Sequence, residues 1–348
     1  VYACQSMGIT MTNTCINYQT IMPPVFGEHV AFGDTGVVIY SNSVCGARSN
    51  FEGGPSALAA GLTGRTPKYG LHMDANRKAT KRYQVNMQPQ DLMEWGLLGA
   101  TIGKMAGSYW EVPVIQGIEI TPTSDQLKHF GAAMASFGSI PLYHIEGITP
   151  ECQKLVDVEG EELPVTNVTE LEINNLKKPF DTKGEKVDVV VFAAPQLSII
   201  EMAELAELCA GKHRANTTDV IVCTSSQVYG DAVSMGYVEK IESAITDKTS
   251  AIIPPQLNGR VCDMDAIFSI ANEYDLQIYE DSAQALGAKY KDKTAGTFGI
   301  AGCISFYPAK NVGAFGDAGL ISTNNKNCLL YTSPSPRDQR GSRMPSSA

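Results

Sequence analysis

The chain has 348 residues, a formal net charge of −10 at pH 7, and 43% hydrophobic residues. The acidic balance argues against nucleic-acid binding, and no apolar run is long enough to cross a membrane, which leaves a globular protein with a sizeable core. Nine cysteines without a CxxC pair predict reduced, mostly buried thiols and a cytoplasmic location. Because the chain opens at Val1 with neither a Met nor a signal peptide, we expect an N-terminally truncated fragment.

Residues 42–70 are the stretch around which we expect the chain to be organised. They follow an apolar run, residues 37–40, which predicts a buried strand. Ligand sites in open α/β sheets lie where strands end, and arginine suits a carboxylate or a phosphate. The candidates for such a site are the polar residues at the predicted strand end and in the glycine-rich loop after it: Asn42, Ser43, Arg48, Asn50 and Glu52. The apolar residues 57–60 follow at once and place the loop close to the core; a turn with solvated charges is the alternative.

Two polar pairs flank this stretch. Glu28 and His29 could supply acid–base groups or substrate contacts, or could be a polar pair at the start of a strand. His72 and Asp74 are two residues apart and would share a face of a strand; the alternative is an exposed loop that includes the basic residue Arg77.

Farther along, apolar residues at helical spacing predict helices over residues 92–102 and 121–137. Residues 140–145 predict a strand. His144 and Glu146 lie near its end and are further site candidates, with a polar strand end as the alternative.

The third part of the chain alternates between strand and helix. Residues 187–192 and 220–224 predict strands, and between them Ser198 and Glu201 form a capping box that opens a helix. Strand–loop–helix alternation predicts a parallel sheet covered by helices, and therefore an α/β fold.

Two runs of sequence carry a resemblance to a known family. GARSNFEGGPSALAAGLTGRTPKYGLHMDANRKAT, residues 46–80, and PPVFGEHVAF, residues 23–32, resemble the aconitase X family of hydro-lyases, and a looser likeness continues to about residue 244. The resemblance implies an aconitase-like catalytic domain over residues 1–244, with parallel sheets and covering helices. It also implies a dehydratase that acts on a small hydroxy acid such as cis-3-hydroxyproline or phosphomevalonate.

The same resemblance assigns roles to the candidate residues. Arg48 would bind the acid, His29 would lie in the catalytic site, and the remaining polar residues of the loop would complete the pocket: Asn42, Ser43, Asn50 and Glu52. In the family a smaller swivelling subunit or domain completes the site, so we expect such a partner. The sequence does not place the general base.

The resemblance also implies an iron–sulfur cluster on three cysteines, with Cys15 as one ligand; an ordinary half-buried thiol is the alternative. Cluster-bearing relatives have a cysteine before the proline in the loop after the strand at 187–192, where this chain has Ala193 and Ala194 before Pro195. Three thiolates normally hold such a cluster in this family, so Cys15 alone argues against its assembly.

From about residue 245 the sequence resembles a different family. AITDKTSAIIPPQLNGRVCDMDAI, IYEDSAQALGAKYKDKTAGTFG and CISFYPAKNVGAFGDAGLIST are similar to DegT/DnrJ-type sugar aminotransferases, which use pyridoxal phosphate. Residues 245–327 would be a partial large domain of that α/β fold. Asp281, after a predicted strand, would pair with the pyridine nitrogen, and Gln284 would contact the ring. Ser305 would bind the phosphate and Lys310 would form the Schiff base. Because the N-terminal part of that family is absent, we expect weak or no cofactor binding.

Residues 328–348 contain CLLYTSPSPRD and SRMPSSA, which resemble translated sequencing adapter, and their Ser, Pro and Arg content predicts disorder. The economical interpretation is a chimeric transcript made of two enzyme fragments and an adapter tail. A non-catalytic chimera without function is a third hypothesis beside the dehydratase and the aminotransferase. A genuine fusion gene is the rival interpretation.

Overall fold

The computed structural model describes residues 6–10, 12, 14–160, 162–180, 189–211, 219–243, 251–252, 254, 256, 261–273, 276–306 and 319–324. These residues divide into two compact units, one reaching to residue 243 and one starting at residue 251. Both units combine parallel strands with helices, which confirms the predicted α/β class.

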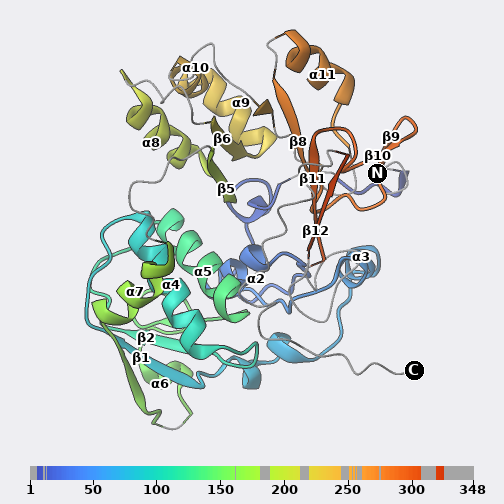
Figure 1. The fold of residues 1–348 in the computed structure, drawn as a ribbon. Helices are drawn as coiled ribbons and strands as arrows, with labels where there is room; N and C mark the ends of the chain where they lie inside the picture. The colour runs from blue at the N-terminus through green and yellow to red at the C-terminus, as the bar shows by residue number, and fades with distance from the viewer. Residues whose placement is uncertain are drawn as a thin grey trace, which may run out of the picture. The chain divides into compact units, whose positions relative to one another are not determined.

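A four-stranded, fully parallel sheet forms the centre of the first unit, with strand order β3-β2-β1-β4. Its strands are β1 (Lys81–Val85), β2 (Pro113–Gln116), β3 (His144–Ile145) and β4 (Val165–Val168). Its helices are α4 (Leu92–Ala106), α5 (Ser124–Gly138), α6 (Leu155–Val158) and α7 (Glu170–Lys177). Figure 1 shows α4, α5 and α7 on one side of these strands and α6 on the other. Neighbouring residues of β2 follow this division, because Ile115 joins the large core and Val114 packs with Val158 of α6.

The predicted helices at 92–102 and 121–137 are confirmed as α4 and α5. They approach each other closely through glycines: a Cβ on Gly103 would lie 2.4 Å from the carbonyl oxygen of Met134. The strand predicted at 140–145 is shorter than expected, because only His144 and Ile145 pair with β2.

The third part of the first unit contains two parallel strands, as predicted. Its elements are β5 (Val189–Leu197), α8 (Ile199–Cys209), β6 (Asp219–Thr224), α9 (Ser226–Ser234) and α10 (Tyr237–Ser243). The capping box is confirmed, with Ser198 Oγ accepting from the Glu201 N–H and Glu201 accepting from the Ser198 N–H. Met202 and Leu205 of α8 join the same core as α4 and α5.

The N-terminal segment differs from the prediction. Residues 37–40 lie in a helix, α2 (Thr35–Ser43), and not in a strand. Asp34 caps this helix, since its Oδ1 accepts from the N–H groups of Gly36 and Val37. Residues 37–43 are buried on every side, so the sequence shows no helical periodicity and a short apolar run imitates a strand.

The apolar residues 57–60 are also placed differently. They belong to α3 (Gly54–Thr63), which has no buried residue, so this run is not what holds the loop near the core. His72 and Asp74 lie in the 3-10 helices η2 (Gly70–His72) and η3 (Asp74–Arg77) and not on a strand. None of the helices in the described part of the chain combines the length and the apolar composition that a bilayer span requires.

The second unit has its own sheet, with strand order β12-β11-β8-β7, in which only β12 is antiparallel to its neighbour. Its strands are β7 (Ala251–Ile252), β8 (Gln277–Asp281), β11 (Ala301–Ser305) and β12 (Gly319–Thr323). A hairpin of β9 (Lys289–Tyr290) and β10 (Lys293–Thr294) and the helix α11 (Met264–Glu273) accompany it. Its core is a separate cluster that includes Val261, Met264, Ile278 and Ala295.

Candidate functional site

A buried hydrogen-bond network holds the loop after α2. Asn42 Nδ2 donates to the carbonyls of Ser49 and Pro141 at 2.8 and 2.9 Å, and Asn42 Oδ1 accepts from the Ser49 N–H at 2.9 Å. Ser43 Oγ accepts from the N–H of Tyr143 at 2.9 Å. These interactions, and not the apolar run of α3, fix the loop against the core.

Arg77 is a central residue of this network, which contradicts the alternative of an exposed loop. It is only 3% exposed. Its guanidinium donates to Asn42 Oδ1 and to the Asn42 carbonyl at 3.3 and 3.1 Å, and to the Leu71 carbonyl at 3.1 Å. It also donates to both carboxylate oxygens of Glu151 at 2.6–3.0 Å. Arg77 therefore ties the end of α2 to the segment that contains η2. An arginine three residues after an aspartate gives no sequence signal for this role.

Asn50 brings the same two segments together from the other side. Its Oδ1 accepts from the Leu71 N–H at 2.8 Å, and its Nδ2 donates to the Tyr69 carbonyl at 3.3 Å. Gly70 has φ +58°, and a Cβ there would lie 2.1 Å from Asn50 Oδ1, so only glycine fits this turn.

The guanidinium of Arg48 faces outward from this framework. Arg48 pairs with His29 in a parallel bridge, with its N–H donating to the Glu28 carbonyl at 2.8 Å. Arg48 Nη1 forms an ion pair with Asp74 Oδ1 at 2.5 Å, and the side-chain exposures are 17% for Arg48 and 85% for Asp74. A nearly buried cation thus meets an anion that lies in solvent.

His29 and His72 lie next to this ion pair. Their Nδ1 atoms are 2.9 Å apart and their rings are stacked, with centroids 5.1 Å apart. His72 is 6% exposed, whereas His29 is exposed. Burial lowers the pKa of His72, and the charge of His29 lowers it further, while the carboxylate of Glu52 opposes both effects.

Glu52 is a buried carboxylate of this site. It is 5% exposed, and no group in the described part of the chain forms a hydrogen bond with its Oε1. A buried carboxylate oxygen without a donor is costly, so its position calls for a partner that reaches it from the site. The structure therefore brings His29, Arg48, Glu52, His72 and Asp74 together.

His144 and Glu146 serve the framework. His144 is buried and its Nε2 donates to the Arg77 carbonyl at 2.8 Å; burial lowers the pKa of this imidazole. Glu146 accepts from Gln116 Nε2 at 2.8 Å and from the Leu155 N–H at 3.3 Å.

Cys15 has different neighbours. Its N–H donates to Gln196 Oε1 at 3.1 Å, so it lies beside the residues where the family resemblance implies a second cluster ligand. These residues were predicted as a loop, but they lie in β5, which continues to Leu197 with an irregular pairing after Phe192. Burial, and secondarily the charge of Asp34, raises the pKa of the Cys15 thiol to about 11, so it is protonated at neutral pH. The described residues contain no group of three potential metal ligands. This donor set does not fit an iron–sulfur cluster, which needs thiolates.

A second buried charged group lies near Cys15 and was not foreseen. Lys128 of α5 has a fully buried side chain, forms a short ion pair with Glu201, and lies 3.1 Å from Asp125 Oδ1. His129 Nε2 lies 2.6 Å from the other Glu201 oxygen. This cluster joins α5 to the start of α8.

In the second unit, two of the predicted cofactor residues lie on neighbouring strands. Asp281 ends β8, Ser305 ends β11, and these strands are parallel with Asp281 opposite Cys303. Asp281 and Ser305 therefore lie at the same edge of this sheet. Gln284 follows Asp281 in the turn after β8, and Lys310 lies outside the described residues.

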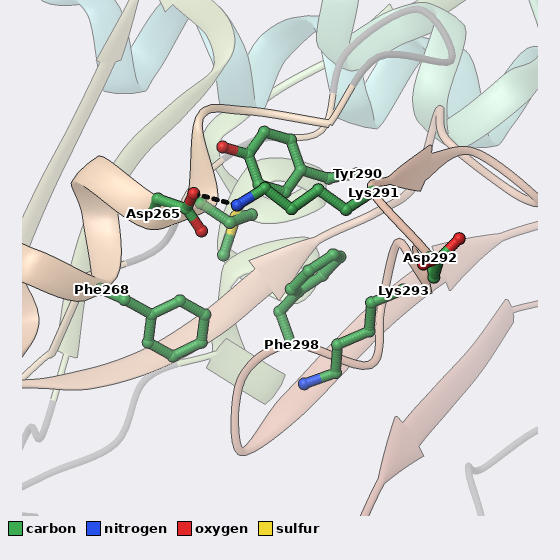
Figure 2. A pocket seen from close by; sticks show the side chains of 8 residues that line it. Asp265, Phe268, Tyr290, Lys291, Asp292, Lys293 and Phe298 are labelled. Atoms are coloured by element: carbon green, nitrogen blue, oxygen red, sulfur yellow. Dashed lines mark hydrogen bonds and ion pairs between the residues drawn. The ribbon is translucent and has the colours of Figure 1, made fainter.

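Two other features of this unit involve neither Asp281 nor Ser305. Glu280 is 1% exposed and accepts from the N–H groups of Gly296, Phe298 and Gly299 at 2.5–3.1 Å, so it holds the loop after β10. The pocket in Figure 2 is lined by residues of α11 and by residues in and after the hairpin: Met264, Asp265, Phe268, Tyr290, Lys291, Asp292, Lys293 and Phe298.

Comparisons with known proteins match the two parts of the chain to different families. Residues 1–75, 79–181 and 187–247 match the first, second and third domains of aconitase X, and residues 232–331 match the DegT/DnrJ/EryC1/StrS aminotransferase family. The chain is 36% identical over 238 residues to the phosphomevalonate dehydratase large subunit of Thermococcus kodakarensis, covering 68% of this chain and 60% of that protein. It is 35% identical over 249 residues to the cis-3-hydroxy-L-proline dehydratase of Hypocrea jecorina, covering 69% and 41%.

The solved structure of aconitase X from Thermococcus kodakaraensis in its holo form is similar with a TM-score of 0.64 and 35% identity, covering 70% of this chain and 63% of that one. The chain thus spans less than two thirds of each of these relatives. The chain belongs to the aconitase X family over the residues that its three domain models match, and residues 232–331 are similar to the DegT/DnrJ/EryC1/StrS aminotransferase family.

Proposed function

We propose that the aconitase X part of this chain binds the carboxylate of a small hydroxy acid through Arg48 and takes part in the elimination of water from it. The ion pair between Arg48 and Asp74 carries this proposal. The carboxylate of Asp74 already pairs with Nη1 of the mostly buried Arg48 guanidinium, and the Asp74 side chain is 85% exposed. A substrate carboxylate can replace Asp74 at little cost, because exposed ion pairs contribute little to stability.

The surrounding residues suit an elimination. The reaction takes a proton from carbon and delivers one to the departing hydroxyl, so it needs groups that exchange protons near neutral pH. Imidazole and carboxylate side chains can accept and donate protons, and the side chains of His29, His72 and Glu52 lie beside Arg48. Phosphomevalonate and cis-3-hydroxyproline both contain a carboxylate, so Arg48 fits either substrate. The first relative is named a large subunit, and we propose that a smaller subunit or domain also completes the site of this chain.

Calorimetric titration of the full chain with each of the two acids tests this proposal. Arg48→Ala should weaken binding at least about tenfold, since it removes a charge-assisted contact. Arg65→Ala removes an exposed arginine from the same region and should leave binding unchanged. Equal affinities of the Arg48 and Arg65 variants would contradict the proposal. Proton NMR of the bound acid then follows the loss of water.

A second candidate function is supported by the placement of Asp281 and Ser305 at the ends of two neighbouring parallel strands. When bound, pyridoxal phosphate supplies an electron sink for amino-group transfer. We propose that this segment binds the cofactor weakly, because the chain holds only part of that family's fold.

Borohydride reduction after incubation with the cofactor should label Lys310 well below one equivalent, with Lys310→Ala as the control. Stoichiometric labelling would show a competent site. Failure of both the acid-binding and the cofactor assays would favour a non-catalytic chimera.

A further inference from the structure

The contact between His29 and His72 has a feature that an ordinary ring stack lacks. The two Nδ1 atoms face each other at 2.9 Å, which is a hydrogen-bonding distance. Such a bond needs one N–H and one lone pair, so only one of the two facing nitrogens can hold a hydrogen. Two protonated Nδ1 atoms would repel each other. The pair therefore holds one shared hydrogen in its centre, and it can bind one additional proton on an outer nitrogen without breaking the contact.

The two ends of the pair differ in their access to solvent. His29 is exposed, so its outer nitrogen exchanges protons with water. His72 is 6% exposed, and its Nε2 lies 3.4 Å from Thr66 Oγ1. The charges that act on His72 come from His29, Arg48 and Arg77 on one hand and from Glu52 on the other. Burial and the two guanidiniums, opposed by one carboxylate, disfavour a lasting positive charge on the inner ring.

Glu52 is the acidic group that acts on the inner ring of the pair, His72. Its Oε1 is buried and has no hydrogen-bond donor among the described residues, although its charge acts on His72. Arg48, the proposed carboxylate-binding residue, pairs with His29 through the backbone. The inner end of the pair and the free carboxylate oxygen thus lie in the region where the substrate would bind.

We propose that His29 and His72 form a proton relay that shares one hydrogen and connects solvent to the Arg48 and Glu52 site. This inference rests on the proposed dehydratase function. In that reaction the C–H bond breaks, its electron pair forms the double bond, and the C–O bond breaks while the departing hydroxide accepts a proton to leave as water. The group that accepts the carbon-bound proton has to release it before the next turnover. The relay carries that proton out: His72 accepts on Nε2, the shared hydrogen moves to Nδ1 of His29, and His29 releases its own Nε2 proton to water. The reverse transfer restores the pair: His72 gives its Nε2 proton to the departing hydroxide, the shared hydrogen returns to Nδ1 of His72, and His29 takes a proton from water on Nε2.

The first test measures the pair without any substrate. Nitrogen-15 NMR of the full chain with labelled histidines, recorded from pH 5 to pH 9, distinguishes Nδ1–H from Nε2–H rings. His29→Gln and His72→Gln assign the signals among the five histidines. We expect one of the two rings to be the Nδ1–H form, and the pair to take up a single proton in one coupled step. Two Nε2–H rings that titrate independently would overturn the shared-hydrogen pair.

The second test separates relay from positioning. His29→Asn retains an amide oxygen that can accept the Nδ1–H of His72 but cannot transfer a proton, whereas His29→Ala removes both the acceptor and the proton transfer. In deuterated water with the bound hydroxy acid, both variants should slow exchange of the substrate's carbon-bound hydrogen roughly tenfold or more. Added imidazole should restore exchange in His29→Ala, because that position is open to solvent.

The outcomes distinguish the relay from the proposed function. Loss of exchange in His29→Ala, rescue by imidazole and an unchanged His72 tautomer in His29→Asn would support the relay. Normal exchange in His29→Asn, with acid still bound through Arg48, would overturn the relay and leave the proposed function standing. If the wild-type chain neither binds the acid nor exchanges its hydrogen, the proposed function fails and so does the relay that rests on it.

Discussion

Asp74 and Arg48 form an ion pair whose two partners have very different surroundings, and this predicts how the pair responds to a ligand. Asp74 is 85% exposed, so the pair contributes at most about 1 kcal/mol to folding. Asp74→Asn should leave the free energy of unfolding in urea within about 1 kcal/mol of the wild type. It should tighten the binding of a small carboxylate to Arg48, because the internal competitor is gone, and calorimetry measures this directly. Weaker binding in Asp74→Asn would mean that Asp74 orients Arg48 for the ligand.

Glu201 is the residue whose titration should dominate the acid sensitivity of the first unit. Burial raises its pKa, but His129, Lys128 and the Ser198 N–H outweigh burial and lower it to about 2, against 4.5 without these contacts. A lowered carboxyl pKa contributes stability that is fully present above pH 4.5 and is lost as the pH falls toward 2. The shift corresponds to about 3 kcal/mol.

Urea unfolding followed by tryptophan fluorescence at pH 7, 4 and 3 tests this expectation. The wild type should lose stability steeply below pH 4.5, while Glu201→Gln should start less stable and show a flatter pH dependence, because its side chain does not titrate. Parallel loss of stability in both proteins would place the acid-sensitive group elsewhere.

At the residue scale, sequence reasoning found side chains that carry their signal locally and missed those defined by long-range contacts. Arg48, His29 and Glu52 stand in or near a glycine-rich loop, and the structure brings them together with His72. Arg77 and Lys128 are buried by partners 74 and 73 residues away in the sequence, Glu151 and Glu201. No spacing rule detects such pairs, since a lone arginine or lysine on a polar segment resembles a solvated one.

At the element scale, burial decided where the predictions succeeded. α5 and α8 each bury one face; apolar spacing predicted α5, and a capping box predicted α8. α2 has successive buried residues and was predicted as a strand. α3 is apolar yet exposed, and its residues were predicted to lie close to the core. Both errors have one cause, because an apolar run reports hydrophobicity and not the number of neighbours that surround it.

The contact between α4 and α5 predicts opposite effects for two glycines of the same helix. A Cβ at Gly103 would lie 2.4 Å from the Met134 carbonyl oxygen, whereas a Cβ at Gly96 would meet no atom within 4 Å. Gly103→Ala should therefore destabilise the first unit by about 1–3 kcal/mol through overpacking. Gly96→Ala should be neutral or stabilising by up to about 1 kcal/mol, because alanine favours helix more than glycine does.

Urea unfolding of the two variants, compared with the wild type, checks both signs at once. A loss of stability in Gly96→Ala similar to that in Gly103→Ala would mean that the helix, and not the contact between the helices, sets the cost.

At the scale of the whole molecule, the described residues of the two units bury separate sets of side chains. One core includes Trp95, Ile115 and Phe130, and the other includes Met264 and Ile278. The sheets are also separate, since no strand of one sheet pairs with a described strand of the other. Each unit matches a different family, which is why motifs alone divided the sequence near residue 245. Residues 244–250 and 325–348 lie outside the described residues, so the join and the tail remain predictions.

We predict that the two units unfold independently, and the positions of the tryptophans make this measurable. The chain has two tryptophans, Trp95 and Trp110, and both lie in the first unit, whereas circular dichroism reports on both units. Ile115 and Ile278 are buried to a similar degree, at 0% and 4% exposure, one in each core. Isoleucine to alanine at a buried site costs about 2–5 kcal/mol.

Ile115→Ala should therefore shift the fluorescence transition in urea to lower concentration, while Ile278→Ala should leave that transition in place and move only part of the circular dichroism change. This follows because independent units share no stabilising contacts, so energy lost in one core cannot alter the population of the other. If Ile278→Ala moved the tryptophan transition as much as Ile115→Ala does, the two units would unfold as one cooperative structure. Such coupling requires a substantial shared interface, which two unrelated fragments joined by chance have no reason to possess and which a genuine fusion protein would.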